Sequence, residues 1–344
     1  MKITKTKLKQ IIKEEIEQLA RGRSNITLSS DQVQNIRQTQ NRAQKIIKLL
    51  TSPDPGNVEQ GLTILEALED QQLTDTIASH FVFRSDGRIT IRGFKIPDQT
   101  LGMILNYFAE KSVHVKNMLA QIENLIIASN NFITNVDFLR FCTNLTSLSL
   151  SRCKSLENVD GLVGCTNLNW LDLYYCQSLE NIDALKGCTN LNWLDLSRCK
   201  SLQNIDGLVG CTNLTELDLY WCKSLQNVDA LQGLTNLTKL ALGWCESLQN
   251  VDVLEGCTNL TELDLSYCRS LQNVDALQGL TNLTELNLSR CKSLQNVDAL
   301  QGLTNLTTLN LFECHSLPLE LQELFESNEH GTAYEQFMTA LNAF

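Results

Sequence analysis

The chain contains 344 residues, with 28 lysines and arginines against 39 aspartates and glutamates, for a formal net charge of −11. A nucleic-acid-binding protein needs a basic surface that releases counterions from phosphates, so this charge balance argues against that class and favours basic or neutral partners. We find neither a signal peptide nor an apolar run long enough to span a bilayer.

Residues 1–24 predict an amphipathic leader helix, because the apolar residues from Ile3 to Leu19 follow roughly one helical face. Seven basic and three acidic groups give this segment a net charge of +4. Two interpretations remain open: the helix packs on the rest of the chain, or it docks on an acidic partner or a membrane surface. We expect no other membrane association.

Residues 25–119 predict a mainly helical region with one hairpin. The apolar spacing and the turn residues predict helices over 31–50, 57–68, 72–79 and 98–108, the last with Asp98 as its cap, and a hairpin of 81–84 with 89–92. Residues 113–119 lead into the next part of the chain. We expect residues 80–119 to cover the exposed N-terminal end of the segment that begins at residue 120.

One phrase, close to TNLTELDLSYCKSLQNVDALQGL, recurs every 23 residues in eight copies that start at Thr143 and end near residue 324. A weaker upstream copy covers residues 120–142, so the repeats span 120–324, and residues 325–344 predict a helical C-terminal cap. We number the positions of each copy as offsets 1 to 23. Apolar residues occupy offsets 3, 6, 8, 11, 14, 17, 20 and 23.

This pattern matches the leucine-rich repeat signature LxxLxLxxN/CxL, in which each copy supplies one strand and a return segment. The wording also resembles the bacterial internalin-type repeat, with one residue inserted after the strand and cysteine in place of asparagine. The resemblance implies an α/β leucine-rich repeat solenoid, or horseshoe, with a parallel concave sheet and short 3-10 turns on the convex side. A single copy cannot bury its apolar residues alone, so we expect stability to come from stacking.

All 13 cysteines fall on offset 11 or offset 23, and leucine replaces cysteine at offset 23 in other copies. We therefore predict buried free thiols that fill apolar positions, with no disulfides, no metal site and no cofactor. Many free thiols predict a reducing compartment: a cytoplasm, or a host cytoplasm into which the protein is delivered.

Two polar columns also recur. Aspartate at offset 18 is expected to cap a short 3-10 turn by accepting backbone hydrogen bonds, in preference to binding calcium. Asparagine at offset 16 and the Thr-Asn pair at offsets 1 and 2 are expected to bond the turn backbone.

The sequence contains no catalytic constellation. Its four histidines are scattered, and it has no phosphate loop, nucleophile elbow or paired-carboxylate motif. We therefore predict that the protein is not an enzyme.

The variable offsets 5, 7, 9 and 10 carry all four tryptophans and four of the six tyrosines. Aromatic residues are enriched in interface hot spots, and an aspartate column beside them would attract a cationic partner. Strand propensity alone offers a second interpretation of the aromatic residues. The predicted partner-binding residues are Trp170, Asp172, Tyr174, Tyr175, Trp193, Asp195, Asp218, Tyr220, Trp221, Trp244, Asp264 and Tyr267.

We therefore predict a non-catalytic, monomeric protein-interaction scaffold that binds a basic or amphipathic protein segment on an aromatic and acidic concave face. Two alternatives stay open. Carbohydrate-binding modules also combine aromatic platforms with carboxylates, and a bacterial effector could use such an array to read its substrate.

Overall fold

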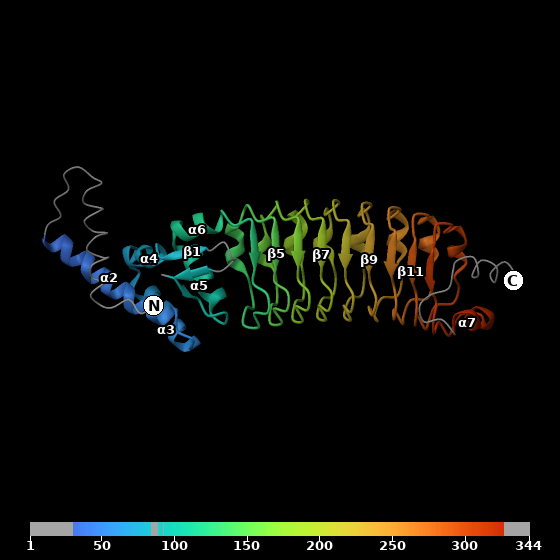
Figure 1. The fold of residues 1–344 in the computed structure, drawn as a ribbon, viewed down its shortest axis with the longest axis horizontal. Coiled ribbons are helices and arrows are strands. Elements are labelled where there is room, and N and C mark those ends of the chain that lie inside the picture. Colours follow the sequence, from blue (N-terminus) through green and yellow to red (C-terminus); the bar gives the residue numbers. More distant parts are fainter. Residues whose placement is uncertain (1–29, 84–88, 92, 327–344) are drawn as a thin grey trace.

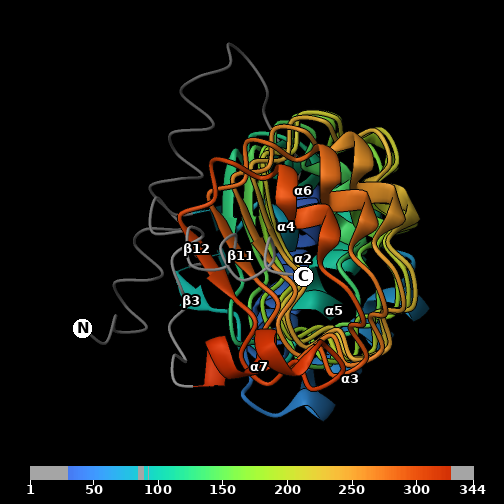
Figure 2. The ribbon, with the colours of Figure 1, turned by 90° about the vertical axis from the view of Figure 1, so that its right-hand side faces the viewer.

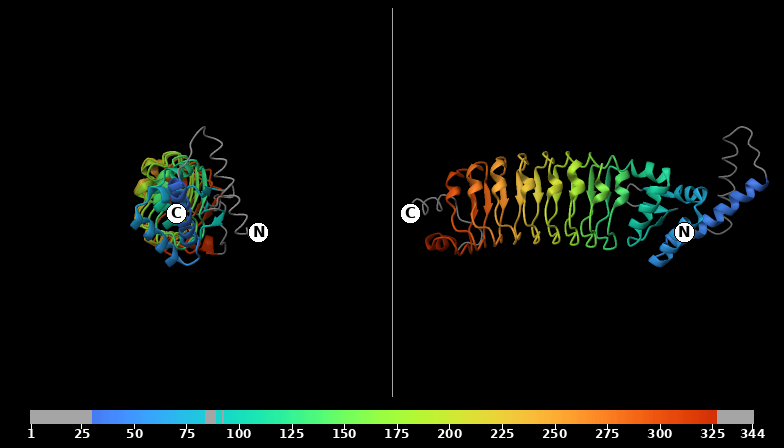
Figure 3. Two further views of the ribbon diagram at one scale, coloured as in Figure 1. Left: turned by 90° about the vertical axis from the view of Figure 1, so that its left-hand side faces the viewer. Right: turned by 180° about the vertical axis from the view of Figure 1, so that it is seen from behind.

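The computed structural model describes residues 30–83, 89–91 and 93–326. Figure 1 shows a helical N-terminal part, a long stack of repeats along the main axis of the molecule, and a short helix at the other end. The view from behind shows the same order (Figure 3). The predicted leader helix at residues 1–24 lies outside the described residues.

Three helices form the first layer: α2 (Ser30–Leu50), α3 (Pro55–Leu68) and α4 (Gln71–Ala78). Helix α2 packs on α3 and α4 through a buried stripe with helical spacing, which includes Ala43, Ile47 and Leu50. The Asp54 and Asp70 side chains cap α3 and α4, because each accepts a backbone N–H at 3.0 Å. These helices confirm the sequence prediction to within two residues at each end.

The predicted hairpin is present as β1 (Phe81–Phe83) and β2 (Ile89–Ile91), and a third strand, β3 (Phe94–Lys95), pairs with β2. The sequence did not predict β3 because two residues carry too little pattern. Helices α5 (Leu101–Lys111) and α6 (Val113–Leu119) follow. The predicted cap at Asp98 is wrong: α5 begins at Leu101, and Asp98 instead pairs with Lys95 at 2.9 Å.

Helix α5 closes the N-terminal end of the repeats. The Asn106 side chain donates to Asn135 Oδ1 at 2.7 Å and accepts the Phe138 N–H at 2.8 Å. Phe138 itself is fully buried against the helical part. Helix α5 thus bonds one backbone N–H of the first repeat turn and covers its buried ring, as expected of a solenoid cap.

Each repeat supplies one short strand, and the strands form a parallel sheet in which every residue pairs with the residue 23 positions later. The strands are β4 (Asn124–Ile126), β5 (Ser147–Ser149), β6 (Trp170–Asp172), β7 (Trp193–Asp195), β8 (Glu216–Asp218), β9 (Lys239–Ala241), β10 (Glu262–Asp264), β11 (Glu285–Asn287) and β12 (Thr308–Asn310). They cover offsets 5 to 7, shorter than the predicted offsets 5 to 9. The hydrogen-bond ladder nevertheless continues, since the N–H groups at offsets 8 and 10 donate to the next repeat.

Short 3-10 helices form the opposite side of the stack, as predicted. They are η1 (Asp137–Phe141), η2 (Asp160–Leu162), η3 (Asp183–Gly187), η4 (Asp206–Leu208), η5 (Asp229–Leu231), η6 (Asp252–Gly256), η7 (Asp275–Gly279) and η8 (Asp298–Gly302).

The predicted capping role of the offset-18 aspartates is wrong. Among the described residues, no backbone N–H of these turns donates to an aspartate carboxylate; instead, asparagine at offset 16 accepts the aspartate N–H, as Asn158 does for Asp160 at 3.2 Å. A capping side chain normally comes from the residue just before the first helical residue. The aspartate is itself the first residue of each 3-10 helix, so it lies one position too late to act as the cap. The predicted bonding of turn backbone by asparagine is confirmed at offset 16, and at offset 2 the Asn190 amide donates to Thr166 O of the preceding copy at 2.9 Å.

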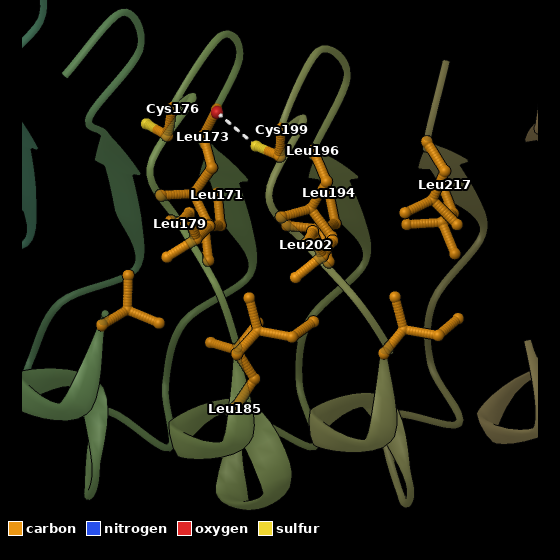
Figure 4. Close-up of a cluster of buried hydrophobic side chains, with 14 of the residues drawn as sticks. Leu171, Leu173, Cys176, Leu179, Leu185, Leu194, Leu196, Cys199, Leu202 and Leu217 are labelled. Carbon is orange, nitrogen blue, oxygen red and sulfur yellow. Dashed lines mark hydrogen bonds between the residues drawn. The ribbon is translucent and has the colours of Figure 1, made fainter. Parts of the chain in front are cut away.

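Leucines and cysteines fill the space between the sheet and the 3-10 helices (Figure 4). The predicted buried free thiols are confirmed, because all 13 cysteines are buried and unpaired with one another. At offset 11 each thiol donates to a main-chain oxygen of the preceding copy; Cys199 Sγ lies 3.3 Å from Leu173 O. Burial raises the pKa of the thiols in both columns, that of Cys153 at offset 11 to about 11 and that of Cys142 at offset 23 to about 12.

Helix α7 (Leu319–Glu326) covers the last repeat, where Leu321 and Phe325 are buried. In the end-on view it lies below the strands (Figure 2). The rest of the predicted C-terminal cap lies outside the described residues.

Candidate functional site

A groove of about 570 Å³ runs over the sheet from β7 to β12. Offsets 5 and 7 point into it because alternate residues of a strand face the same side. We call it the acidic groove; its polar and aromatic lining residues are Trp193, Glu216, Asp218, Lys239, Glu262, Asp264, Glu285, Asn287, Thr308 and Asn310.

The groove carries an excess of negative charge. Five carboxylates line it, and the one lysine among its lining residues, Lys239, is paired with Glu262 at 2.7 Å. No ion pair involving Glu216 or Glu285 occurs in the described part of the chain. The groove therefore favours a positively charged occupant.

The aspartates at offset 7 have a structural role as well. Asp172, Asp195, Asp218 and Asp264 each accept the backbone N–H two residues later, at 2.7 to 2.9 Å, and hold the turn after the strand. Burial raises the pKa of Asp195, and it raises the pKa of Asp218 to about 6, with a smaller contribution from Asp195 and Asp264.

Two of the predicted tryptophans lie side by side at offset 5. The rings of Trp170 and Trp193 stack with centroids 4.7 Å apart and planes 7° apart. Parallel strands lie about 4.8 Å apart, so identical side chains in register stack without further adjustment. Trp193 forms the N-terminal end of the acidic groove.

The other two tryptophans lie at offset 10, in the turn that follows the strand. Every described residue at this offset, from Ser129 to Glu313, has a left-handed backbone with φ between 57° and 66°. Bulky residues rarely adopt this conformation. Within this column Trp221 stacks on Trp244 at 5.3 Å, and Trp244 stacks on Tyr267 at 3.8 Å.

Cations extend this column of rings. The Arg198 guanidinium lies 4.8 Å from the centroid of Trp221, and that of Arg290 lies 4.8 Å from Tyr267. Lysine at offset 12 adds to it, since the Lys223 amine lies 5.5 Å from both Trp221 and Trp244. The edge of the stack therefore combines aromatic rings with basic groups.

The structure divides the twelve predicted residues between these two surfaces. Trp193, Asp218 and Asp264 line the acidic groove, and Trp170 stacks beside it. Tyr175, Trp221, Trp244 and Tyr267 form the turn column. Asp172 and Asp195 hold turns. The offset-9 residues lie next to the turn column, with Tyr174 5.7 Å from the Arg152 guanidinium and the rings of Tyr220 and Trp221 6.3 Å apart.

Sequence reasoning missed the charges at offset 5 and offset 12. Glu216, Glu262 and Glu285 occupy the strand position that tryptophan holds in earlier copies. Because the sequence predicted that this position faces the concave surface, it could have identified these glutamates as part of the site. Of the described residues, no group of three or more histidines, cysteines, aspartates or glutamates is arranged to hold a metal ion. No described helix is both long and apolar enough to cross a membrane.

Comparison with known proteins places this fold. A profile of the BspA type leucine-rich repeat region matches residues 91–203 and 196–318. No curated protein matches.

Similar solved structures include three leucine-rich repeat proteins. An internalin (inlF) from Listeria monocytogenes is 19% identical over 63% of this chain and 68% of its own, with a TM-score of 0.47. Internalin C2 (inlC2) from the same organism is 25% identical over 62% of this chain and 92% of its own, with a TM-score of 0.49. The leucine-rich repeat domain of the type III effector XopL is 17% identical over 80% of this chain and 93% of its own, also with a TM-score of 0.49.

Leucine-rich repeat arrays present extended surfaces for binding proteins, and the sheet face and edge described above are surfaces of this kind. The chain belongs to the BspA-type leucine-rich repeat family, whose profile matches most of its length.

Proposed function

We propose that the protein is a non-catalytic interaction scaffold that binds a basic or amphipathic protein segment in the acidic groove. The observation that carries this proposal is the unbalanced charge of the groove, where five carboxylates face one lysine. A cationic side chain would neutralise carboxylates that the protein leaves without an ion pair.

The stacked pair of Trp170 and Trp193 supplies an apolar anchor at one end of the groove. An amphipathic segment would place its apolar residues on these rings and its basic residues against Glu216, Glu262 and Glu285. Both rings are half-buried, so part of their surface is available to a partner.

Ring stacking disfavours the carbohydrate-binding alternative. Sugars bind to the open faces of aromatic rings, whereas the rings of Trp170 and Trp193 cover one face of each other. We further propose that the protein works as a monomer and that it works in a reducing compartment, a source or host cytoplasm. The 13 free thiols support the choice of compartment.

The proposal is tested with two labelled 16-residue peptides of the same apolar pattern, one with lysine and one with glutamate at the polar positions. We expect fluorescence anisotropy to show saturable binding of the lysine peptide alone. Trp193→Ala should weaken that binding about tenfold, the scale of one interface hot spot. Trp244→Ala is the matched control, since it also removes one stacked tryptophan but lies outside the groove. Equal binding of both peptides would contradict the proposal.

A further inference from the structure

The edge formed by offsets 10 and 12 is a second surface, opposite in charge to the groove. Eight basic residues gather along this edge over copies one to seven. We call them the cationic edge: Arg152, Lys154, Arg198, Lys200, Lys223, Arg269, Arg290 and Lys292. In a chain with a net charge of −11, such a cluster is a departure from the rest of the molecule.

Most of this charge is not neutralised by the protein. Lys223 pairs with Glu246 at 2.8 Å, and Arg290 pairs with Glu313 at 3.1 Å. Among the described residues, no carboxylate lies within ion-pair distance of the other six cations. Five of those six cations are exposed, whereas Arg198 and the rings of the turn column are half-buried.

Tyrosine and tryptophan rings lie beside five of these six cations, four of them at rings of the turn column and Arg152 at Tyr174. Arg152, Lys154, Arg198, Lys200 and Arg269 each lie 4.8 to 6.0 Å from the centroid of a tyrosine or tryptophan ring. A guanidinium that stacks on a ring keeps its N–H donors in its own plane, where they remain available to a carboxylate. The left-handed turn fixes the spacing of the column to that of the strands.

We propose that the cationic edge binds an acidic protein segment in an extended conformation. From copy one to copy seven the edge spans six strand spacings, on the order of 29 Å, which matches about nine extended residues. In an extended segment every second side chain points to the same side. Acidic residues at those positions would place their carboxylates against the cations. This site is separate from the acidic groove and does not depend on the function proposed for it.

A single-stranded nucleic acid is the main competitor as an anionic occupant. Such proteins bind bases by stacking them on open aromatic faces. On the cationic edge, the faces of Trp221, Trp244 and Tyr267 are covered by one another and by Arg198 and Arg290. The covered ring faces leave no room for nucleic-acid bases to stack, whereas carboxylates can still approach the cations along the edges of the rings. The geometry therefore favours an acidic protein segment over a nucleic acid.

The test uses fluorescence anisotropy at low and moderate salt with three labelled probes: a 12-residue peptide of alternating glutamate and serine, the same peptide with lysine, and a 12-nucleotide oligothymidylate. The edge variant carries Lys154→Gln, Lys200→Gln, Arg269→Gln and Lys292→Gln, which leave the turn column intact. The control variant carries Arg37→Gln, Lys45→Gln, Lys48→Gln and Lys111→Gln, four exposed cations of the helical part. Circular dichroism and Tm confirm that both variants fold.

We expect the glutamate peptide to bind the wild type and the control variant, and to bind the edge variant at least tenfold more weakly. The proposal is overturned if the glutamate peptide does not bind, if both variants weaken it equally, or if the oligothymidylate binds more tightly. Self-association of the wild type that the edge variant abolishes would also overturn it, because the occupant would then be a second copy of the chain.

Discussion

The rings of Trp244 and Tyr267 stack with centroids 3.8 Å apart and planes 15° apart, although they belong to different repeats. Both residues have a left-handed backbone, with φ of 64° and 59°. Stacking between repeats therefore accompanies a backbone conformation that bulky residues normally avoid, and each repeat contributes to holding the turn of the next.

This relationship predicts different effects of glycine at two equivalent positions. Ser129→Gly relieves the left-handed conformation and removes no stack, so we expect it to leave the free energy of unfolding unchanged or to raise it by up to about 1 kcal/mol. Trp244→Gly loses two ring contacts and should lower it by about 1–3 kcal/mol. Urea unfolding followed by circular dichroism measures both, and destabilisation of equal size would show that the stacks contribute little.

The buried carboxyl of Asp218 predicts a pH effect on stability. Its pKa rises from 3.8 to about 6 on folding, so between about pH 4 and 6 the folded state binds more protons than the unfolded state. The free energy of unfolding should fall as pH rises through this window, by up to about 3 kcal/mol from this group.

Asp218→Asn should remove that cost and stabilise the protein at pH 7 but not at pH 4. Asparagine keeps the turn hydrogen bond, since Asn287 already accepts the Ser289 N–H at 3.1 Å at the same offset. Urea titrations at the two pH values provide the comparison. A loss of stability at pH 7 would mean that the ionised carboxylate is stabilising.

Gly207 lies at a position where the backbone of the preceding repeat leaves no room for a side chain. Alignment of the repeats does not reveal this restriction. Alanine occupies the same offset at position 184, but a Cβ on Gly207 would lie 1.9 Å from Ile182 O. We expect Gly207→Ala to lower the free energy of unfolding by about 1–3 kcal/mol, because the backbone must shift. Gly187→Ala is the control, as no atom lies within 4 Å of its Cβ position. Equal melting temperatures for the two variants would refute the expectation.

The cysteine columns predict low thiol reactivity. Burial raises the pKa of every described thiol, that of Cys165 to about 11 and that of Cys245 to about 12, and the thiolate is the reactive form. A thiol reagent at pH 8 should label almost none of the 13 cysteines in the native protein and all of them in denaturant. Rapid native labelling of several thiols would contradict the buried columns.

The fold was predictable because its signal is repeated. Leu171, Leu194 and Leu217 occupy one offset in successive copies, and a constant apolar period requires a stack of identical units. Features that occur once were harder to predict. Strand β3 has only two residues, too few to show an alternating pattern. Whether Asn158 or Asp160 caps the turn depends on which residue begins the 3-10 helix, and the sequence does not fix that boundary to one residue.

The site was predictable only in part. The aromatic residues were found, but the sequence placed Trp193 and Trp244 on one face, whereas the left-handed turn puts Trp244 at the edge. No sequence pattern signals that turn, since its residues range from Arg152 to Trp221 and Glu313, none of which favours positive φ. The division into an acidic groove and a cationic edge therefore required the structure.

The proposed binding of a basic segment in the acidic groove depends on the unpaired carboxylates of the groove. Its most direct test is isothermal titration of the lysine-containing amphipathic peptide into Glu216→Gln/Glu285→Gln and into a control, Asp206→Asn/Asp252→Asn, which removes the same charge from the 3-10 side of the stack. We predict that the groove variant binds at least tenfold more weakly than the control at moderate salt. Equal affinities would show that binding follows net charge alone and would contradict the claim.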